Sequence, residues 1–154
     1  MMRKVEPDQI DELPVQVVEE GSFGCTPEEL FASFERDEDW KEWLGINVER
    51  TTEGPYCPGF TRTVRTTTIT LHEVFTVWSA PAEIFFYVER SNNPFLTAFA
   101  ERYTVTELGL MLALEGTAPA AEHVIRTQAA PPRTLLGRHR AAMVAHAAAR
   151  EECA

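Results

Sequence analysis

The strongest constraint on the fold is a run of four strand-like stretches that follow one another with short links. The stretches are 60–66, 69–78, 84–90 and 95–107, and they are rich in Thr, Val and Phe, which favour strands. The links between them carry Ser, Asn and Pro, which favour turns. Because short links join antiparallel neighbours, the sequence predicts an antiparallel sheet.

The alternation of side chains along these stretches predicts one mostly apolar sheet face. If the turn between the first two stretches has an even number of residues, Arg62 shares a face with Glu73. An odd number would bring His72 to that face in place of Glu73. The even alternative gives the face made of Phe60, Arg62, Val64, Ile69, Leu71, Glu73, Phe75, Val77, Ile84, Phe86, Val88, Phe99, Glu101, Tyr103 and Val105. We expect this face to point into the core, with Arg62, Glu73, Glu101 and Tyr103 as its polar members.

Two short helices are expected after a first strand over residues 15–23. The first helix has a complete start: Thr26 suits the N-cap, Pro27 suits the first helical position, and Glu29 completes a capping box. Residues 37–44 look like the second helix. The pattern therefore predicts a mixed α+β fold.

The remaining segments complete one expected domain over residues 15–154. Residues 1–14 carry no clear period, and we expect them to form a flexible N-terminal arm. The composition from residue 133 onward, rich in Ala, Leu, Met and Arg, predicts a long helix. The other expected elements are strands over 46–52 and 110–117 and a connecting segment over 118–132.

Charge and composition narrow the partners. The formal net charge of the 154 residues is −10, and an acidic protein repels phosphate backbones, so no nucleic-acid partner is expected. No stretch approaches the roughly 20 apolar residues that span a bilayer, so no stable membrane insertion is expected. The acidic start of the chain argues against a secretory signal. Three separated cysteines form no CxxC, which favours reduced thiols and a cytoplasmic location. We expect no metal or other cofactor.

Several segments resemble the SRPBCC or START-like superfamily, whose members have the helix-grip fold. The resemblance rests on the segments TPEELF (26–31), WKEWLG (40–45), TRTV (61–64), LHEVF (71–75) and AFAERY (98–103). The chain is especially similar to bacterial polyketide cyclase/dehydrase-like members and to lipid-binding members. The resemblance implies a curved antiparallel sheet of about seven strands wrapped around a long C-terminal helix, with a cavity between them. It carries over no catalytic residues, because the superfamily has no shared catalytic set.

The expected function is binding of a small hydrophobic or amphipathic molecule in that cavity. The candidate ligand-binding residues are Arg62, Glu73, Phe75, Phe86, Phe99, Glu101, Tyr103 and Met143. An alternative is a polyketide aromatase/cyclase or dehydratase, with Glu73 and Tyr103 as catalytic candidates. A second alternative is an interaction domain in which the polar cluster is a structural ion-pair network in a closed core. Aromatic residues on both faces of 84–90 leave a homodimer through the outer face open.

Overall fold

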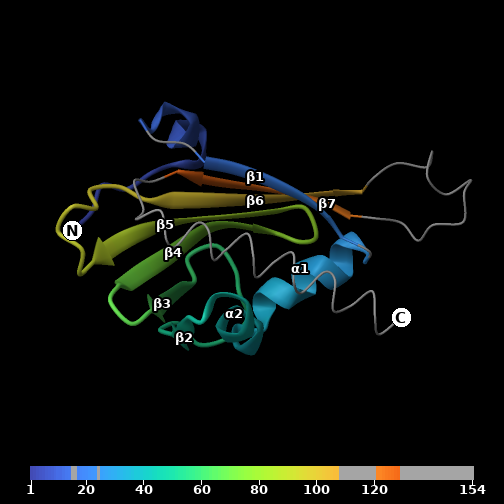
Figure 1. Cartoon of the computed structure of the whole chain (residues 1–154), viewed down its shortest axis with the longest axis horizontal. Coiled ribbons are helices and arrows are strands. Elements are labelled where there is room, and N and C mark those ends of the chain that lie inside the picture. The colour runs from blue at the N-terminus through green and yellow to red at the C-terminus, as the bar shows by residue number, and fades with distance from the viewer. Residues whose placement is uncertain (15–16, 24, 108–120, 129–154) are drawn as a thin grey trace, which may run out of the picture.

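The computed structural model describes residues 1–14, 17–23, 25–107 and 121–128. These residues form one antiparallel sheet covered by short helices (Figure 1). In spatial order the strands are β1 (Val17–Phe23), β7 (Ala121–Gln128), β6 (Ala100–Glu107), β5 (Glu83–Ser91), β4 (Thr70–Ser79), β3 (Thr61–Arg65) and β2 (Asn47–Arg50). The predicted α+β fold with one antiparallel sheet is confirmed.

Both helices after β1 begin where the sequence predicts, and the second also ends there. The α1 helix (Pro27–Glu35) starts with the expected capping box: the Thr26 hydroxyl accepts a hydrogen bond from the Glu29 amide, and the Glu29 carboxylate accepts one from the Thr26 amide. The α2 helix (Asp37–Leu44) ends at Gly45, whose φ of 66° is the left-handed conformation that glycine adopts without strain.

The larger core lies between the inner face of the sheet and the two helices. Its sheet side comes from the predicted apolar face, and its helix side comes mainly from aromatic residues such as Phe34 and Trp40. A register shift in the pairing of β4 with β5, between Phe75 and Val77, changes one expected position. Trp78 packs against the inner core and Val77 against the outer one, so the prediction that Val77 shares a face with Phe75 is wrong. An extra residue at such a bulge reverses the alternation that follows it.

A second core lies on the outer face of the sheet, under the N-terminal segment. Residues 1–14 were expected to form a loose arm, but Val5 and Ile10 are fully buried and pack against Phe85 and Tyr87. The segment contains the 3-10 helix η1 (Pro7–Glu12), which lies on the opposite side of the sheet from α1 and α2 (Figure 1). The outer aromatics of β5 are therefore covered within the chain, which removes the reason for expecting a second subunit there.

The C-terminal part of the chain differs from expectation where it is described. Residues 121–128 form β7, between β1 and β6, although the sequence favoured a connecting segment there. The strand expected over 110–117 and the helix expected from residue 133, with Met143, lie outside the described residues.

Candidate functional site

The hairpin of β3 and β4 brings Arg62 and Glu73 together. Arg65 pairs with Thr70 across the turn, so residues 66–69 form an even turn and Arg62 lies directly opposite Glu73. Both side chains are buried on the inner face, with exposed fractions of 2% and 4%. The alternative that places His72 on this face is wrong. The His72 ring lies beside the hydroxyl of Thr63, a residue that is not on the inner face.

Arg62 is held by an ion pair and by aromatic rings. Its Nε donates to Glu73 Oε2 at 2.6 Å. Its guanidinium carbon lies 4.8 Å from the centre of a Trp40 ring and 4.9 Å from that of Phe75, distances at which a cation is attracted to a ring face. Burial is the largest single influence on the pKa of Arg62 and lowers it, but the charges of Glu73 and Tyr56 and the hydrogen bonds to both side chains together raise this pKa above its ordinary value. Arg62 therefore stays charged, with Glu73 as its counter-ion.

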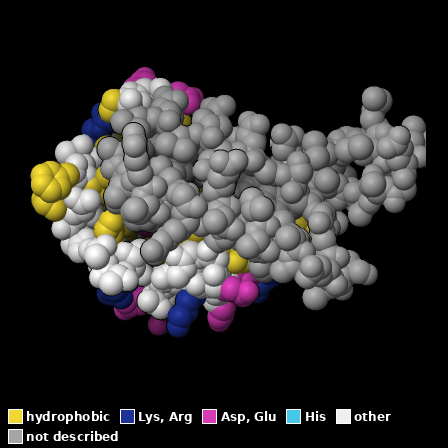
Figure 2. All heavy atoms as spheres, in the orientation of Figure 1, with side chains coloured by type: hydrophobic (Ala, Val, Ile, Leu, Met, Phe, Trp, Pro, Cys, Tyr) yellow, Lys and Arg dark blue, Asp and Glu magenta, His cyan; other side chains and the backbone are white. Residues whose placement is uncertain are grey.

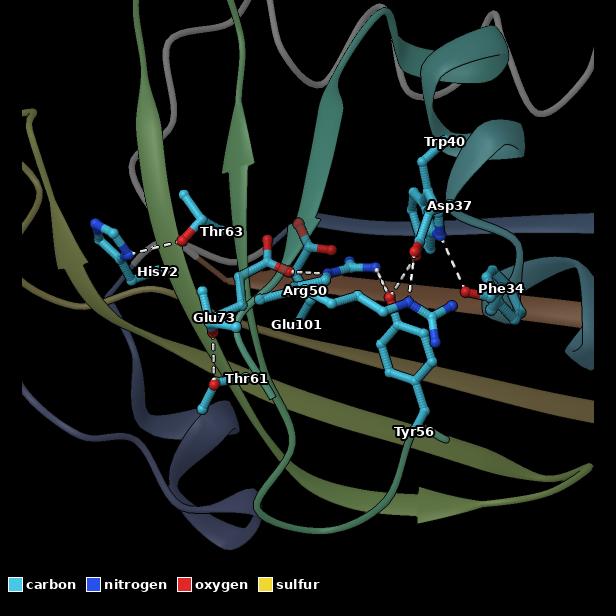
Figure 3. Close-up of polar contacts among 12 residues, drawn as sticks. Phe34, Asp37, Trp40, Arg50, Tyr56, Thr61, Thr63, His72, Glu73 and Glu101 are labelled. Carbon is cyan, nitrogen blue, oxygen red and sulfur yellow. Dashed lines mark hydrogen bonds and ion pairs between the residues drawn. The ribbon is translucent and has the colours of Figure 1, made fainter. Parts of the chain in front are cut away.

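Tyr56 fixes the other edge of the guanidinium and was not predicted from the sequence. Arg62 Nη1 donates to the Tyr56 hydroxyl at 3.2 Å, and that hydroxyl donates to Asp37 Oδ1 at 2.8 Å. Asp37 Oδ2 in turn accepts from Arg50 Nε at 2.5 Å. Figure 3 shows this chain of contacts from Glu73 through Tyr56 to Asp37. Burial raises the pKa of Tyr56 to about 12, so the hydroxyl remains a donor. Tyr56 lies in a Gly- and Pro-rich turn, where no strand or helix period marks a buried side chain.

Glu101 and Tyr103 supply the rest of the polar cluster from β6. They are two residues apart on one strand and point to the same face. Tyr103 donates a short hydrogen bond to Glu101 Oε2. Burial raises the pKa of Glu101 to about 7, although the Tyr103 hydrogen bond and the charge of Arg62 act in the opposite direction. Burial also raises the pKa of Glu73, although the charge of Arg62 and the hydrogen bond from it act in the opposite direction. Glu101 has no such cation bonded to it and changes its protonation near neutral pH.

These side chains line a pocket of about 690 Å³, a volume that includes the part open to solvent. Its wall is formed by Trp40, Leu44, Ile46, Arg62, Val64, Thr66, Ile69, Leu71, Glu73, Phe86, Asn93, Leu96, Phe99, Glu101 and Tyr103. Six of the predicted ligand-binding residues are in this wall: Arg62, Glu73, Phe86, Phe99, Glu101 and Tyr103. The Phe75 ring instead packs against the guanidinium of Arg62. Met143 lies outside the described residues.

The pocket has a buried polar end and a partly exposed end. Arg62, Glu73, Glu101 and Tyr103 are each at most 8% exposed. The half-exposed lining residues of the pocket include Ile69 from the β3–β4 turn, Leu96 from the β5–β6 connection and Leu44 from α2. Figure 2 shows hydrophobic side chains at the left edge of the molecule, where the β5–β6 connection runs in Figure 1.

Within the described residues, no group of three or more His, Cys, Asp or Glu side chains is arranged to hold a metal ion. No helix in this part of the chain is long and apolar enough to cross a membrane.

Comparison with known proteins gives a consistent fold. No family model matches the sequence, and no curated protein matches it significantly. A protein from Deinococcus radiodurans aligns over 91% of this chain and 100% of its own, with a TM-score of 0.64 and 12% identity. A START superfamily protein from Mycobacterium smegmatis aligns over 86% of this chain and 91% of its own, with a TM-score of 0.55 and 10% identity.

The similarity extends to a plant protein. The major latex-like protein 151 from Panax ginseng aligns over 88% of this chain and 98% of its own, with a TM-score of 0.60 and 10% identity. At these identities the likeness concerns the fold and not the activity. The protein therefore has a START-like fold of the kind found in the SRPBCC superfamily.

Proposed function

We propose that the protein binds a small hydrophobic or amphipathic molecule in the inner-face pocket. The observation that carries the proposal is the make-up of the pocket wall, which is mostly apolar but has a buried polar cluster at one end. Small-molecule sites have this character, with apolar walls that supply affinity and a few fixed polar groups that orient the ligand. The proposal includes the helix expected from residue 133 and a contribution from Met143 to the wall.

The apolar wall can be tested by filling it. Leu71 is half-buried and lines the pocket, so Leu71→Trp should occupy the space that a ligand would take. We expect wild-type protein to bind the neutral dye Nile red and Leu71→Trp to bind it at least about tenfold more weakly, a loss of about 1.4 kcal/mol. Fluorescence titration measures both.

The matched control is Thr68→Trp, which adds the same side chain at an exposed position of the same hairpin. It should bind the dye like the wild type. Native mass spectrometry of freshly purified protein should also reveal an apolar molecule released on denaturation. Two outcomes would contradict the proposal: a wild type that binds no apolar molecule, or Trp variants that both bind the dye as well as the wild type. The pocket would then not be a ligand-binding site, and the polar cluster would be a structural network.

A second candidate function is proton-transfer catalysis of the polyketide cyclase or dehydratase type. The observation that favours it is the contact of Tyr103 with Glu101, whose pKa of about 7 suits a group that gives and takes a proton at neutral pH. Of the two catalytic candidates, Glu73 is committed to Arg62 and Tyr103 is better placed. Tyr103→Phe should then keep Nile red binding and lose turnover of a polyketide-like substrate. Full turnover by this variant would exclude Tyr103 as the acid.

A further inference from the structure

The formal charges at the polar end of the pocket do not favour a negatively charged ligand. One guanidinium, that of Arg62, faces two carboxyl groups, those of Glu73 and Glu101. Arg62 is the one Lys or Arg among the described lining residues. Its Nε is bonded to Glu73, its Nη1 to Tyr56, and aromatic rings lie close to the guanidinium. Its charge is therefore already balanced before a ligand arrives.

Glu101 sets the remaining charge. With Glu73 ionised as the counter-ion of Arg62, the cluster is neutral when Glu101 is protonated and carries one net negative charge when Glu101 is ionised. Because burial holds the pKa of Glu101 at about 7, both states occur near neutral pH. In neither state does the cluster offer an unbalanced positive charge.

From this balance we infer that the ligand carries an uncharged or a positively charged polar end, and that the pocket discriminates against carboxylate and phosphate groups. The inference rests on the proposed ligand-binding function and adds the chemical class of the ligand. A buried anion would lie beside two carboxyl groups with no free cation among the described lining residues, and an unpaired buried charge is strongly destabilising. A hydroxyl group can bond to the Glu101 carboxyl, and an ammonium group can pair with it when it is ionised. The net charge of −10 also repels anionic ligands at long range.

The test compares three ligands that differ only in the polar end: dodecylamine, dodecanol and dodecanoate. The full-length chain is titrated with each one at about pH 8, below the micelle concentration, by calorimetry or by displacement of Nile red. We expect the amine and the alcohol to bind at least about tenfold more tightly than the carboxylate. Binding of dodecanoate as tight as that of the other two would overturn the inference. Failure of all three to bind would instead contradict the proposed function.

A matched pair of variants separates the local charge from the overall charge. Glu101→Gln removes the buried carboxyl, and Glu42→Gln removes an exposed one on α2, so both change the net charge equally. Glu101→Gln should reduce the preference for amine over carboxylate by about tenfold, whereas Glu42→Gln should leave it unchanged. Equal preferences in both variants would show that Glu101 is not the discriminating group. Leu71→Trp should weaken binding of all three ligands, which identifies the pocket as their site.

Discussion

At the scale of single residues, the cluster combines one permanent ion pair with one titratable carboxyl. Arg62 and Glu73 compensate each other at 2.6 Å, whereas Glu101 has a neutral phenol as its hydrogen-bond donor. This difference in partners separates two buried carboxyl groups that lie on the same sheet face. Removing one member of the ion pair should therefore lower the free energy of unfolding, and the contribution of Glu101 to that free energy should depend on pH.

The first residue-scale prediction concerns stability against pH. The pKa of Glu101 is raised from 4.5 to about 7 in the folded protein, so between these values the folded state holds a proton that the unfolded state has lost. Its contribution to the free energy of unfolding is therefore present at low pH and is lost as pH rises through about 7, by at most about 3 kcal/mol. Arg62, Glu73 and Tyr103 are the charged or titratable groups that act on this carboxyl.

Urea unfolding at a series of pH values measures this effect. The free energy of unfolding of the wild type should fall relative to that of Glu101→Gln as pH rises between about 4.5 and 8. The exposed variant Glu42→Gln should follow the wild type. A constant difference between wild type and Glu101→Gln across this range would contradict the raised pKa.

The second residue-scale prediction concerns the ion pair. Arg62→Met leaves Glu73 buried without its counter-ion, and we expect a loss of about 3–5 kcal/mol in the free energy of unfolding. The double variant Arg62→Met/Glu73→Leu removes both charges and should recover most of that loss, because an apolar pair fits an apolar core. A double variant with no higher free energy of unfolding than Arg62→Met would show that the two buried charges do not stabilise each other.

At the scale of elements, the N-terminal segment acts as the cover of the outer sheet face. Ile10 is fully buried in the outer core, whereas Glu12 in the same 3-10 helix is exposed. Ile10→Ala should therefore cost about 2–5 kcal/mol of unfolding free energy by urea denaturation, and Glu12→Ala should cost little. A small effect of Ile10→Ala would show that the segment contributes little to the folded state.

Some elements of this structure could be predicted from the sequence and others could not. The β3–β4 hairpin could be predicted, and side-chain alternation placed either Glu73 or His72 on the face of Arg62. The even turn length, which the structure shows, decides for Glu73. The shift after Phe75 could not be predicted, since a bulge depends on the partner strand. The N-terminal segment was missed because its buried residues are few and irregularly spaced, and Tyr56 because its position is set by contacts with Asp37 and Arg62.

At the scale of the whole molecule, two cores share one sheet. The inner core holds the pocket and most of the aromatic residues, and the outer core is small and is closed by the N-terminal segment. The sheet therefore separates the pocket from the outer face. Sequence alternation predicts this two-sided burial only for β5, where both faces are apolar.

The N-terminal residues also contact the β5–β6 connection, which lines the pocket. The Met2 amide donates to the Glu89 carbonyl at 2.8 Å, and the Arg3 amide donates to the Thr97 carbonyl at 2.9 Å. Glu89 lies near the end of β5, and Thr97 lies in the β5–β6 connection next to Leu96. Two backbone hydrogen bonds thus tie the first residues of the chain to both sides of the segment that places Leu96 in the pocket wall. A bulky tag fused next to Met2 should therefore weaken these bonds and shift Leu96, which would change the pocket wall from the other side of the sheet.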